Sequence, residues 1–108
     1  MVNRASEYKA GLVAGTNDTV PMSGYDMSAR GNDFAVGYIV GHSYTASVIA
    51  ASPIAAAMMV GELARVYNLN LHLVCNKMNF NAEECLTARS SYDSAYDDDI
   101  DGEEYLLP

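Results

Sequence analysis

A nine-residue motif occurs twice near the N-terminus, and it strongly limits what this chain can fold into. Residues 7–15 and 33–41 both read acidic, aromatic, two residues, glycine, three residues, glycine. Glycines four residues apart lie on one face of a helix, where a second backbone can approach closely. Because glycine destabilises a helix by roughly 1 kcal/mol relative to alanine, the two motifs predict a pair of helices that cross at their glycine faces. The alternative is that the second glycine of each motif ends its helix. The predicted helix-packing residues are Gly11, Gly15, Gly37 and Gly41.

Alanine, methionine and the eight tyrosines supply much of the apolar surface of the 108-residue chain, which has no Trp and only two Phe. Small residues favour closely spaced helices over a sheet sandwich. The sequence therefore predicts an all-α fold, a small bundle of about four short helices. Residues 1–91 form the expected helical domain, and residues 92–108 form an acidic C-terminal tail that is flexible when alone.

Turn and capping residues divide the first half of the chain. We expect the first motif helix to end at about Ala14 and a loop to follow at 15–24, where Gly, Asn, Asp and Pro gather. A short helical turn is expected at 25–30. Either Asn32 or Asp33 then serves as the N-cap of the second motif helix.

Residues 34–61 carry no charged side chain, and a run of this length is long enough to span a bilayer. Serine, threonine, histidine and Pro53 interrupt the run, however. These interruptions favour a helix that is buried on most sides over a membrane span.

Two further helix starts are visible in the second half. Ser52 precedes Pro53, which predicts an N-cap followed by the first residue of a helix that ends near residue 67. Residues 81–84 form a capping box, and its helix is expected to end at about Ser90. Between these helices, residues 68–75 alternate polar and apolar side chains as in a strand, although a short helix starting after Asn70 fits as well.

Negative charge is concentrated at the C-terminal end. Residues 1–91 hold seven acidic and six basic side chains, whereas residues 92–108 hold seven acidic and no basic ones, and the net charge is −8. This distribution disfavours binding to nucleic acid, which relies on Lys and Arg. It favours a protein partner with a basic surface, or simply solubility. Tyrosine and leucine between the acidic residues suggest an anchor on that partner. The predicted partner-binding residues are Asp93, Asp97, Asp98, Asp99, Asp101, Glu103, Glu104, Tyr105 and Leu106.

Residues that could support catalysis or metal binding are few. His42, His72, Cys75 and Cys85 make a two-Cys, two-His set, but zinc sites usually contain a closely spaced Cys pair, which the sequence lacks. Ser43 beside His42 is no triad signal, and neither motif has the Lys-Ser/Thr of a phosphate-binding loop. We therefore expect no enzyme activity, no metal and no cofactor. Two cysteines without a signal peptide predict reduced thiols and a cytoplasmic location.

The aromatic residue and two glycines of the first motif, a loop proline, an arginine and the aromatic-glycine-aromatic pattern of the second motif follow one another in a recognisable order. In this order, residues 5–41 resemble the ribosome modulation factor family of small bacterial proteins. The resemblance implies a two-helix core and a ribosome-associated function. The residues that carry it are Tyr8, Gly11, Gly15, Pro21, Arg30, Phe34, Gly37 and Tyr38.

Three functional hypotheses follow. The leading one is a small acidic inhibitor or regulator, of the kind that phages and mobile elements encode, which takes the place of nucleic acid on a basic surface of a nucleic-acid-handling complex. The second is a ribosome-associated modulation factor. The third is a structural or assembly protein whose Ala/Gly-rich helices form a homo-oligomer. Met58 and Met59 belong either to the core or to an adaptable binding surface.

Overall fold

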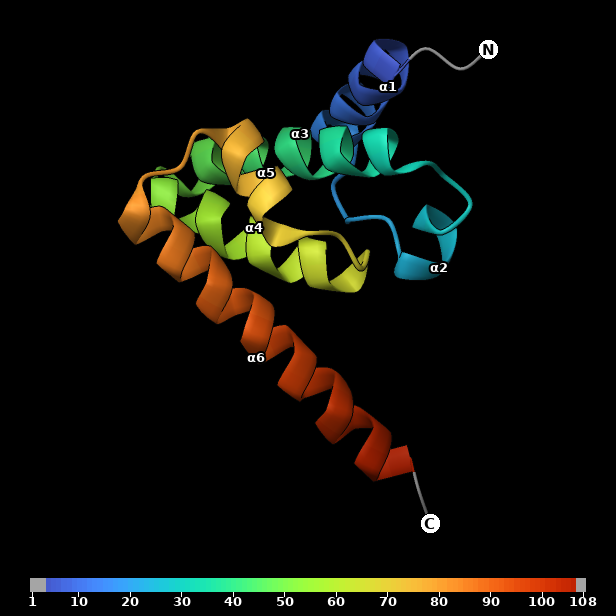
Figure 1. Ribbon diagram of the computed structural model, residues 1–108, viewed down its shortest axis with the longest axis vertical. Helices are drawn as coiled ribbons and strands as arrows, with labels where there is room; N and C mark the ends of the chain where they lie inside the picture. Colours follow the sequence, from blue (N-terminus) through green and yellow to red (C-terminus); the bar gives the residue numbers. More distant parts are fainter. Residues whose placement is uncertain (1–3, 107–108) are drawn as a thin grey trace.

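The computed structural model describes the backbone of residues 4–106 and the side chains of residues 5–95. The described residues form six α-helices and no strand, so the all-α class is confirmed, with six helices in place of about four. Helix α4 runs back alongside α3, and α6 crosses α4 and continues beyond it (Figure 1). The helices are α1 (Arg4–Asn17), α2 (Gly24–Met27), α3 (Asn32–Ala50), α4 (Pro53–Val66), α5 (Leu71–Met78) and α6 (Ala82–Leu106).

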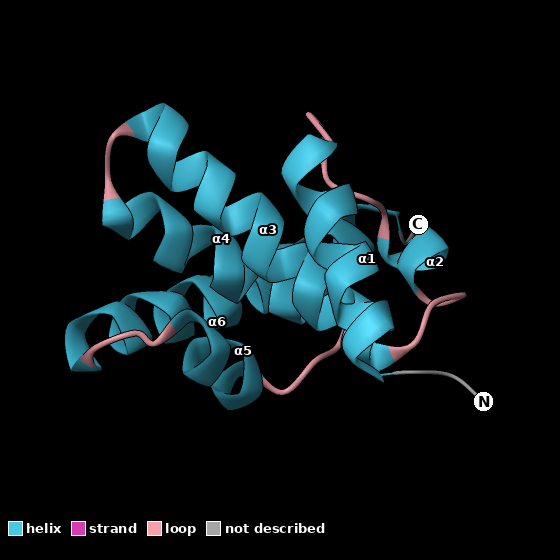
Figure 2. Ribbon diagram, turned by 90° about the horizontal axis from the view of Figure 1, so that it is seen from above, coloured by secondary structure: helices cyan, strands magenta, loops and turns pink. Residues whose placement is uncertain are grey.

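The two glycine motifs lie face to face where α1 and α3 cross (Figure 2). A β-carbon at Gly11 would collide with the carbonyl oxygen of Phe34, and one at Gly37 would collide with that of Tyr8. Phe34 and Tyr8 occupy matching positions in the two motifs. The contacts are therefore reciprocal, with each carbonyl oxygen close to the other helix's glycine, a geometry that suits weak Cα–H···O hydrogen bonds.

The second glycine of each motif repeats this arrangement one turn later. Gly15 faces the carbonyl oxygen of Tyr38, and Gly41 faces that of Leu12. One turn forward along α1, the contact also lies one turn forward along α3. The two helices therefore cross with their chains running in the same general direction. Both glycines lie inside their helices, and the alternative that they end them is wrong. Helix α1 continues past the expected end at Ala14 to Asn17.

Backbone caps divide the uncharged run into two helices. Gly31, in an extended conformation, is the N-cap of α3, so the prediction of Asn32 or Asp33 is wrong by one or two positions. At the other end, Ala51 adopts a left-handed conformation with φ 53° and closes α3. Ser52 and Pro53 then start α4 as predicted. In the described part of the chain, no helix is both long and apolar enough to cross a membrane.

Helix α4 turns its small residues toward the other helices. Ala57 and Gly61 are buried, and a β-carbon at Gly61 would collide with the carbonyl oxygen of Ala88 in α6. Nearby, the Ser91 hydroxyl donates a hydrogen bond to the carbonyl oxygen of Met58 at 2.7 Å. Met58 is itself 54% exposed, while Met59 packs against the core. Close packing against α6 thus leaves no room for a side chain at Gly61, while larger residues of α4 such as Val60 and Leu63 are buried in the core.

Most of the segment 68–75, for which the sequence allows a strand or a helix, lies in helix α5. The Asn70 side chain accepts a hydrogen bond from the backbone N–H of His72 at 2.9 Å and caps the helix. Leu71, Val74 and Cys75, at helical spacing, are buried together. The strand alternative is wrong, because a helix places these three side chains on one face toward the bundle.

Helix α6 begins as its capping box predicts. The backbone N–H of Asn81 donates to the Glu84 carboxylate at 3.0 Å, and the backbone N–H of Glu84 donates to the Asn81 side chain at 2.8 Å. The helix does not end near Ser90 but continues to Leu106. The domain boundary predicted at residue 91 therefore falls inside a continuous helix.

Candidate functional site

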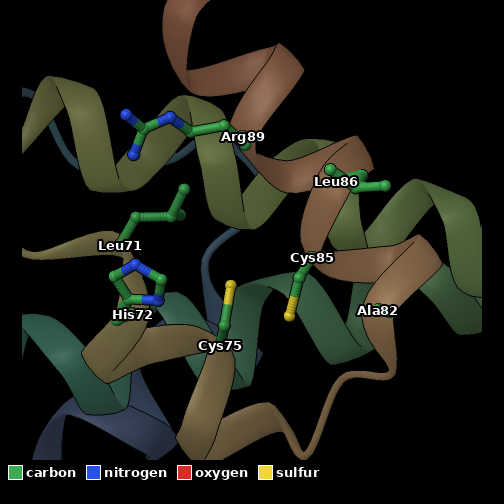
Figure 3. Close-up of a pocket in the computed structure, with 7 residues that line it drawn as sticks. All are labelled: Leu71, His72, Cys75, Ala82, Cys85, Leu86 and Arg89. Carbon is green, nitrogen blue, oxygen red and sulfur yellow. The ribbon is translucent and has the colours of Figure 1, made fainter.

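A pocket of about 530 Å³ lies between α5 and the first turns of α6, and both cysteines line it (Figure 3). Helix α5 brings its buried face to the pocket, and α6 brings residues three and four positions apart, which share one side of a helix. Most of the lining is apolar. We call this site the thiol pocket; its lining residues are Leu71, His72, Cys75, Ala82, Cys85, Leu86 and Arg89.

The two thiols of the pocket are free and close to each other. Figure 3 shows both sulfur atoms in the gap between the two helices. Cys75 is only 4% exposed, whereas Cys85 is half-buried, with its Sγ 3.9 Å from the carbonyl oxygen of Phe80. Burial, together with a smaller effect of the neighbouring Cys85, raises the pKa of Cys75 to about 11. The pocket thus holds one deep and one accessible thiol.

Polar groups lie at the rim of the thiol pocket. His72 is exposed in the first turn of α5. Arg89 follows Cys85 by one helical turn, and its Nε lies 3.7 Å from a carboxylate oxygen of Asp93. Both side chains of this pair are well exposed, so solvent screens their attraction and it stabilises the fold very little. Figure 3 shows the Arg89 side chain directed away from the two sulfur atoms.

The two histidines and two cysteines do not come together in one place. His42 lies in the α1–α3 crossing, where it is buried and its Nδ1 donates to the carbonyl oxygen of Gly15 at 3.1 Å. His72 shares the thiol pocket with the cysteines. Among the described residues, no group of three or more His, Cys, Asp or Glu side chains is placed to hold a metal ion.

A second polar cluster surrounds Tyr38, which is fully buried. Its hydroxyl donates to the Asp18 carboxylate at 2.5 Å and accepts from the backbone N–H of Met22 at 2.8 Å. The Tyr67 hydroxyl donates to the carbonyl oxygen of Met22 at 2.6 Å. The cluster fastens the loop between α1 and α2 to α3 and to the end of α4, which indicates a structural role.

Burial and these hydrogen bonds shift the titration of the two tyrosines. Desolvation and the hydrogen bond to Asp18 raise the pKa of Tyr38 to about 12. Desolvation also raises the pKa of Tyr67 well above its ordinary value. No pattern in the sequence reveals the cluster, because its members lie 16 to 45 residues apart along the chain.

The predicted partner-binding residues belong to the C-terminal part of α6. Tyr92 still packs, with the Arg65 guanidinium carbon 5.6 Å from its ring centroid. Asp93, the first predicted residue, is exposed and paired with Arg89. The other predicted residues have side chains outside the described part of the structure; they are Asp97, Asp98, Asp99, Asp101, Glu103, Glu104, Tyr105 and Leu106.

Exposed apolar side chains gather near the turn between α3 and α4. Tyr44 and Val48 lie one turn apart on α3 and are both 65% exposed, and the neighbouring Ile49 is 81% exposed. On α4, Ile54 and Met58 are also one turn apart and exposed. Large exposed apolar groups at such density are typical of contact surfaces.

Residues 4–98 match the model of a protein family described as a protein of unknown function, DUF2623. The chain belongs to this family. The matched stretch contains both helix crossings and the thiol pocket, and it ends inside the acidic segment. No curated protein and no solved structure matches the sequence significantly.

Proposed function

We propose that the protein is a small, non-enzymatic regulator that binds a basic surface of a nucleic-acid-handling complex through its acidic segment, residues 92–108. One observation carries this proposal. The contacts of α6 with α4 extend to Tyr92, and the run of acidic side chains without a basic one begins at that point. In this proposal, the packed turns of α6 anchor the segment, and its acidic side chains attract the positive surface of a partner.

The chemistry of the described residues supports a binding role. The buried Tyr38 and His42 have hydrogen-bond partners within the fold, and the Tyr38 pKa is moved away from neutrality. A general acid or base works best with a pKa near the operating pH. Within this part of the chain, surfaces are therefore better candidates for function than the polar cluster.

The experiment compares the full chain with a fragment that stops after Ala95. This fragment keeps Tyr92 and its contact with Arg65, so we expect it to fold. The partner is first identified by affinity capture at low salt, and binding kinetics are then measured over a range of salt concentrations. We expect the fragment to bind much more weakly and to lose the salt-sensitive part of the affinity.

Two matched variants separate charge from anchoring. Replacing Asp97, Asp98, Asp99 and Asp101 by Asn should mainly slow association, because charge attraction steers the encounter. Replacing Tyr105, Leu106 and Leu107 by Ala should mainly speed dissociation. Full affinity in a folded 1–95 fragment would overturn the proposal.

The exposed apolar side chains of α3 and α4 favour a second function, in assembly of copies of this chain. Light scattering distinguishes it, because an oligomer that dissociates in the Ile49→Asp variant would locate the contact there. The resemblance of residues 5–41 to the ribosome modulation factor family implies a ribosome-associated role. This role predicts that the full chain co-sediments with ribosomes.

A further inference from the structure

We propose that the thiol pocket is a redox-modification site, in which Cys75 and Cys85 are joined reversibly into an intramolecular disulfide when the protein meets a peroxide. The proposal goes beyond the binding function and does not depend on it. It concerns residues of α5 and of the first turns of α6, away from the acidic segment.

The geometry of the pocket favours a bond within one molecule. The two side chains come from different helices, both sulfur atoms lie in the gap between these helices, and the thiols are close enough to interact (Figure 3). Cys75 is too deeply buried to meet a thiol of another molecule, whereas half-buried Cys85 lines an open, mostly apolar pocket. A small oxidant can therefore enter at Cys85, while Cys75 is positioned behind it to complete the reaction.

The two thiols have different chemical roles. The Cys85 thiolate attacks one oxygen of hydrogen peroxide and breaks the O–O bond, which gives a sulfenic acid and, after protonation, one water. The Cys75 thiol then loses its proton and attacks the Cys85 sulfur, expelling the hydroxyl group as a second water. Two thiols are oxidised by two electrons, and one peroxide is reduced to two waters.

The disulfide would fix α5 to the start of α6. The two cysteines flank the turn that contains Asn79, in a left-handed conformation, and the capping box of α6. A crosslink here closes a short loop, and it restricts the unfolded chain more than the folded one. We therefore expect the oxidised protein to keep its helices and to melt several degrees higher than the reduced protein.

The test uses the full-length protein and hydrogen peroxide at a small molar excess. Intact-mass analysis should show the loss of two hydrogen atoms, and both thiols should disappear from alkylation together. Peptide mapping should recover a Cys75–Cys85 crosslink, and dithiothreitol should reverse it. Oxidation to sulfinic acid without a crosslink, or crosslinks only between molecules, would overturn the proposal.

Single variants assign the roles. In Cys75→Ala, Cys85 should stop at a sulfenic acid that dimedone traps. In Cys85→Ala, oxidation of the remaining buried thiol should be at least about tenfold slower. Arg89→Gln changes an exposed side chain that is directed away from the sulfur atoms, so it is a matched control and should leave both the melting temperature and the rate of crosslinking unchanged. Equal rates in the two cysteine variants would show that the assigned order is wrong.

Discussion

The α1–α3 and α4–α6 crossings bring helices equally close by different means. At the first, both helices contribute two glycines, and each glycine faces a carbonyl oxygen of the other helix. At the second, only α4 contributes a glycine, Gly61, which faces Ala88, and a side-chain hydrogen bond from Ser91 supplements the contact. The first contact is reciprocal and the second is one-sided.

The difference shows how a contact face can be recognised. At the first crossing, the repeated glycine spacing marks both partners in the sequence. At the second, Ala57 and Gly61 are also four residues apart, but larger apolar residues of α4 surround them in the sequence and make the spacing harder to recognise. In both cases the smallest side chains, and not the largest, mark the surface where helices meet.

The largest expected effect is at the reciprocal crossing. Gly37→Leu should lower the free energy of unfolding by about 3 kcal/mol, because the side chain would displace the backbone of Tyr8. Helix propensity alone predicts the opposite sign. Chemical denaturation measures the change, and a more stable variant would contradict the crossing.

The reciprocity itself can be tested with alanine. Gly11→Ala and Gly37→Ala should destabilise the protein to a similar extent, since each β-carbon meets a carbonyl oxygen at a matching position. A strongly unequal pair would show that one helix adjusts and the other does not.

At the one-sided crossing, we expect Gly61→Ala to be less damaging, at about 2 kcal/mol. The added β-carbon meets the backbone at Ala88 and the side chain of Ser91. Helix α6 is held by α4 mainly along this stretch, so it can move away as a unit. Circular dichroism and hydrogen exchange should show protection lost first in α6, while α1 and α3 remain protected. Equal loss of protection in all helices would show that α6 does not separate from the bundle as a unit.

Tyr38 links stability to pH on the α1–α3 side. Its folded pKa of about 12 exceeds its ordinary value of 10, so the folded state holds this proton more tightly. The resulting stability is complete below pH 10 and is lost as pH rises toward 12. Tyr38→Phe should cost about 1–2 kcal/mol at neutral pH, because Asp18 loses its donor.

Tyr38→Phe should also reduce the loss of folding stability at alkaline pH. Urea denaturation between neutral and alkaline pH measures both effects. The pKa of Tyr67 is raised as well, so Tyr67→Phe should act in the same direction. The double variant should therefore remove more of the alkaline loss of stability than either single variant. An unchanged decline in Tyr38→Phe would contradict the role given to its hydroxyl.

The smallest effect is expected on the outer face of α4. Met58→Ala should change stability by less than about 0.5 kcal/mol, because this side chain is 54% exposed. Val60→Ala, a fully buried position two residues later, should cost about 1–2 kcal/mol. Thermal melts of the two variants would show the reverse order if the methionine face were the buried one.

Local signals in the sequence were sufficient for several elements. The glycine spacing of residues 7–15 and 33–41, the Ser52–Pro53 start and the capping box at 81–84 predicted an all-α fold and where two of its helices begin. These features involve residues within about four positions of each other, so the interactions that stabilise them are present in the local sequence.

Tertiary structure decided what depends on distant partners. Residues 71–78 became a helix because the bundle buries one helical face of them, and α4 buried its small residues because α6 lies against them. The sequence placed Cys75 and Cys85 ten residues apart with a turn between them, and only the packing of α5 on α6 made them neighbours. Alternating or periodic apolar residues show that a segment has a face that can be buried. Which face is buried depends on a segment from elsewhere in the chain that packs against it.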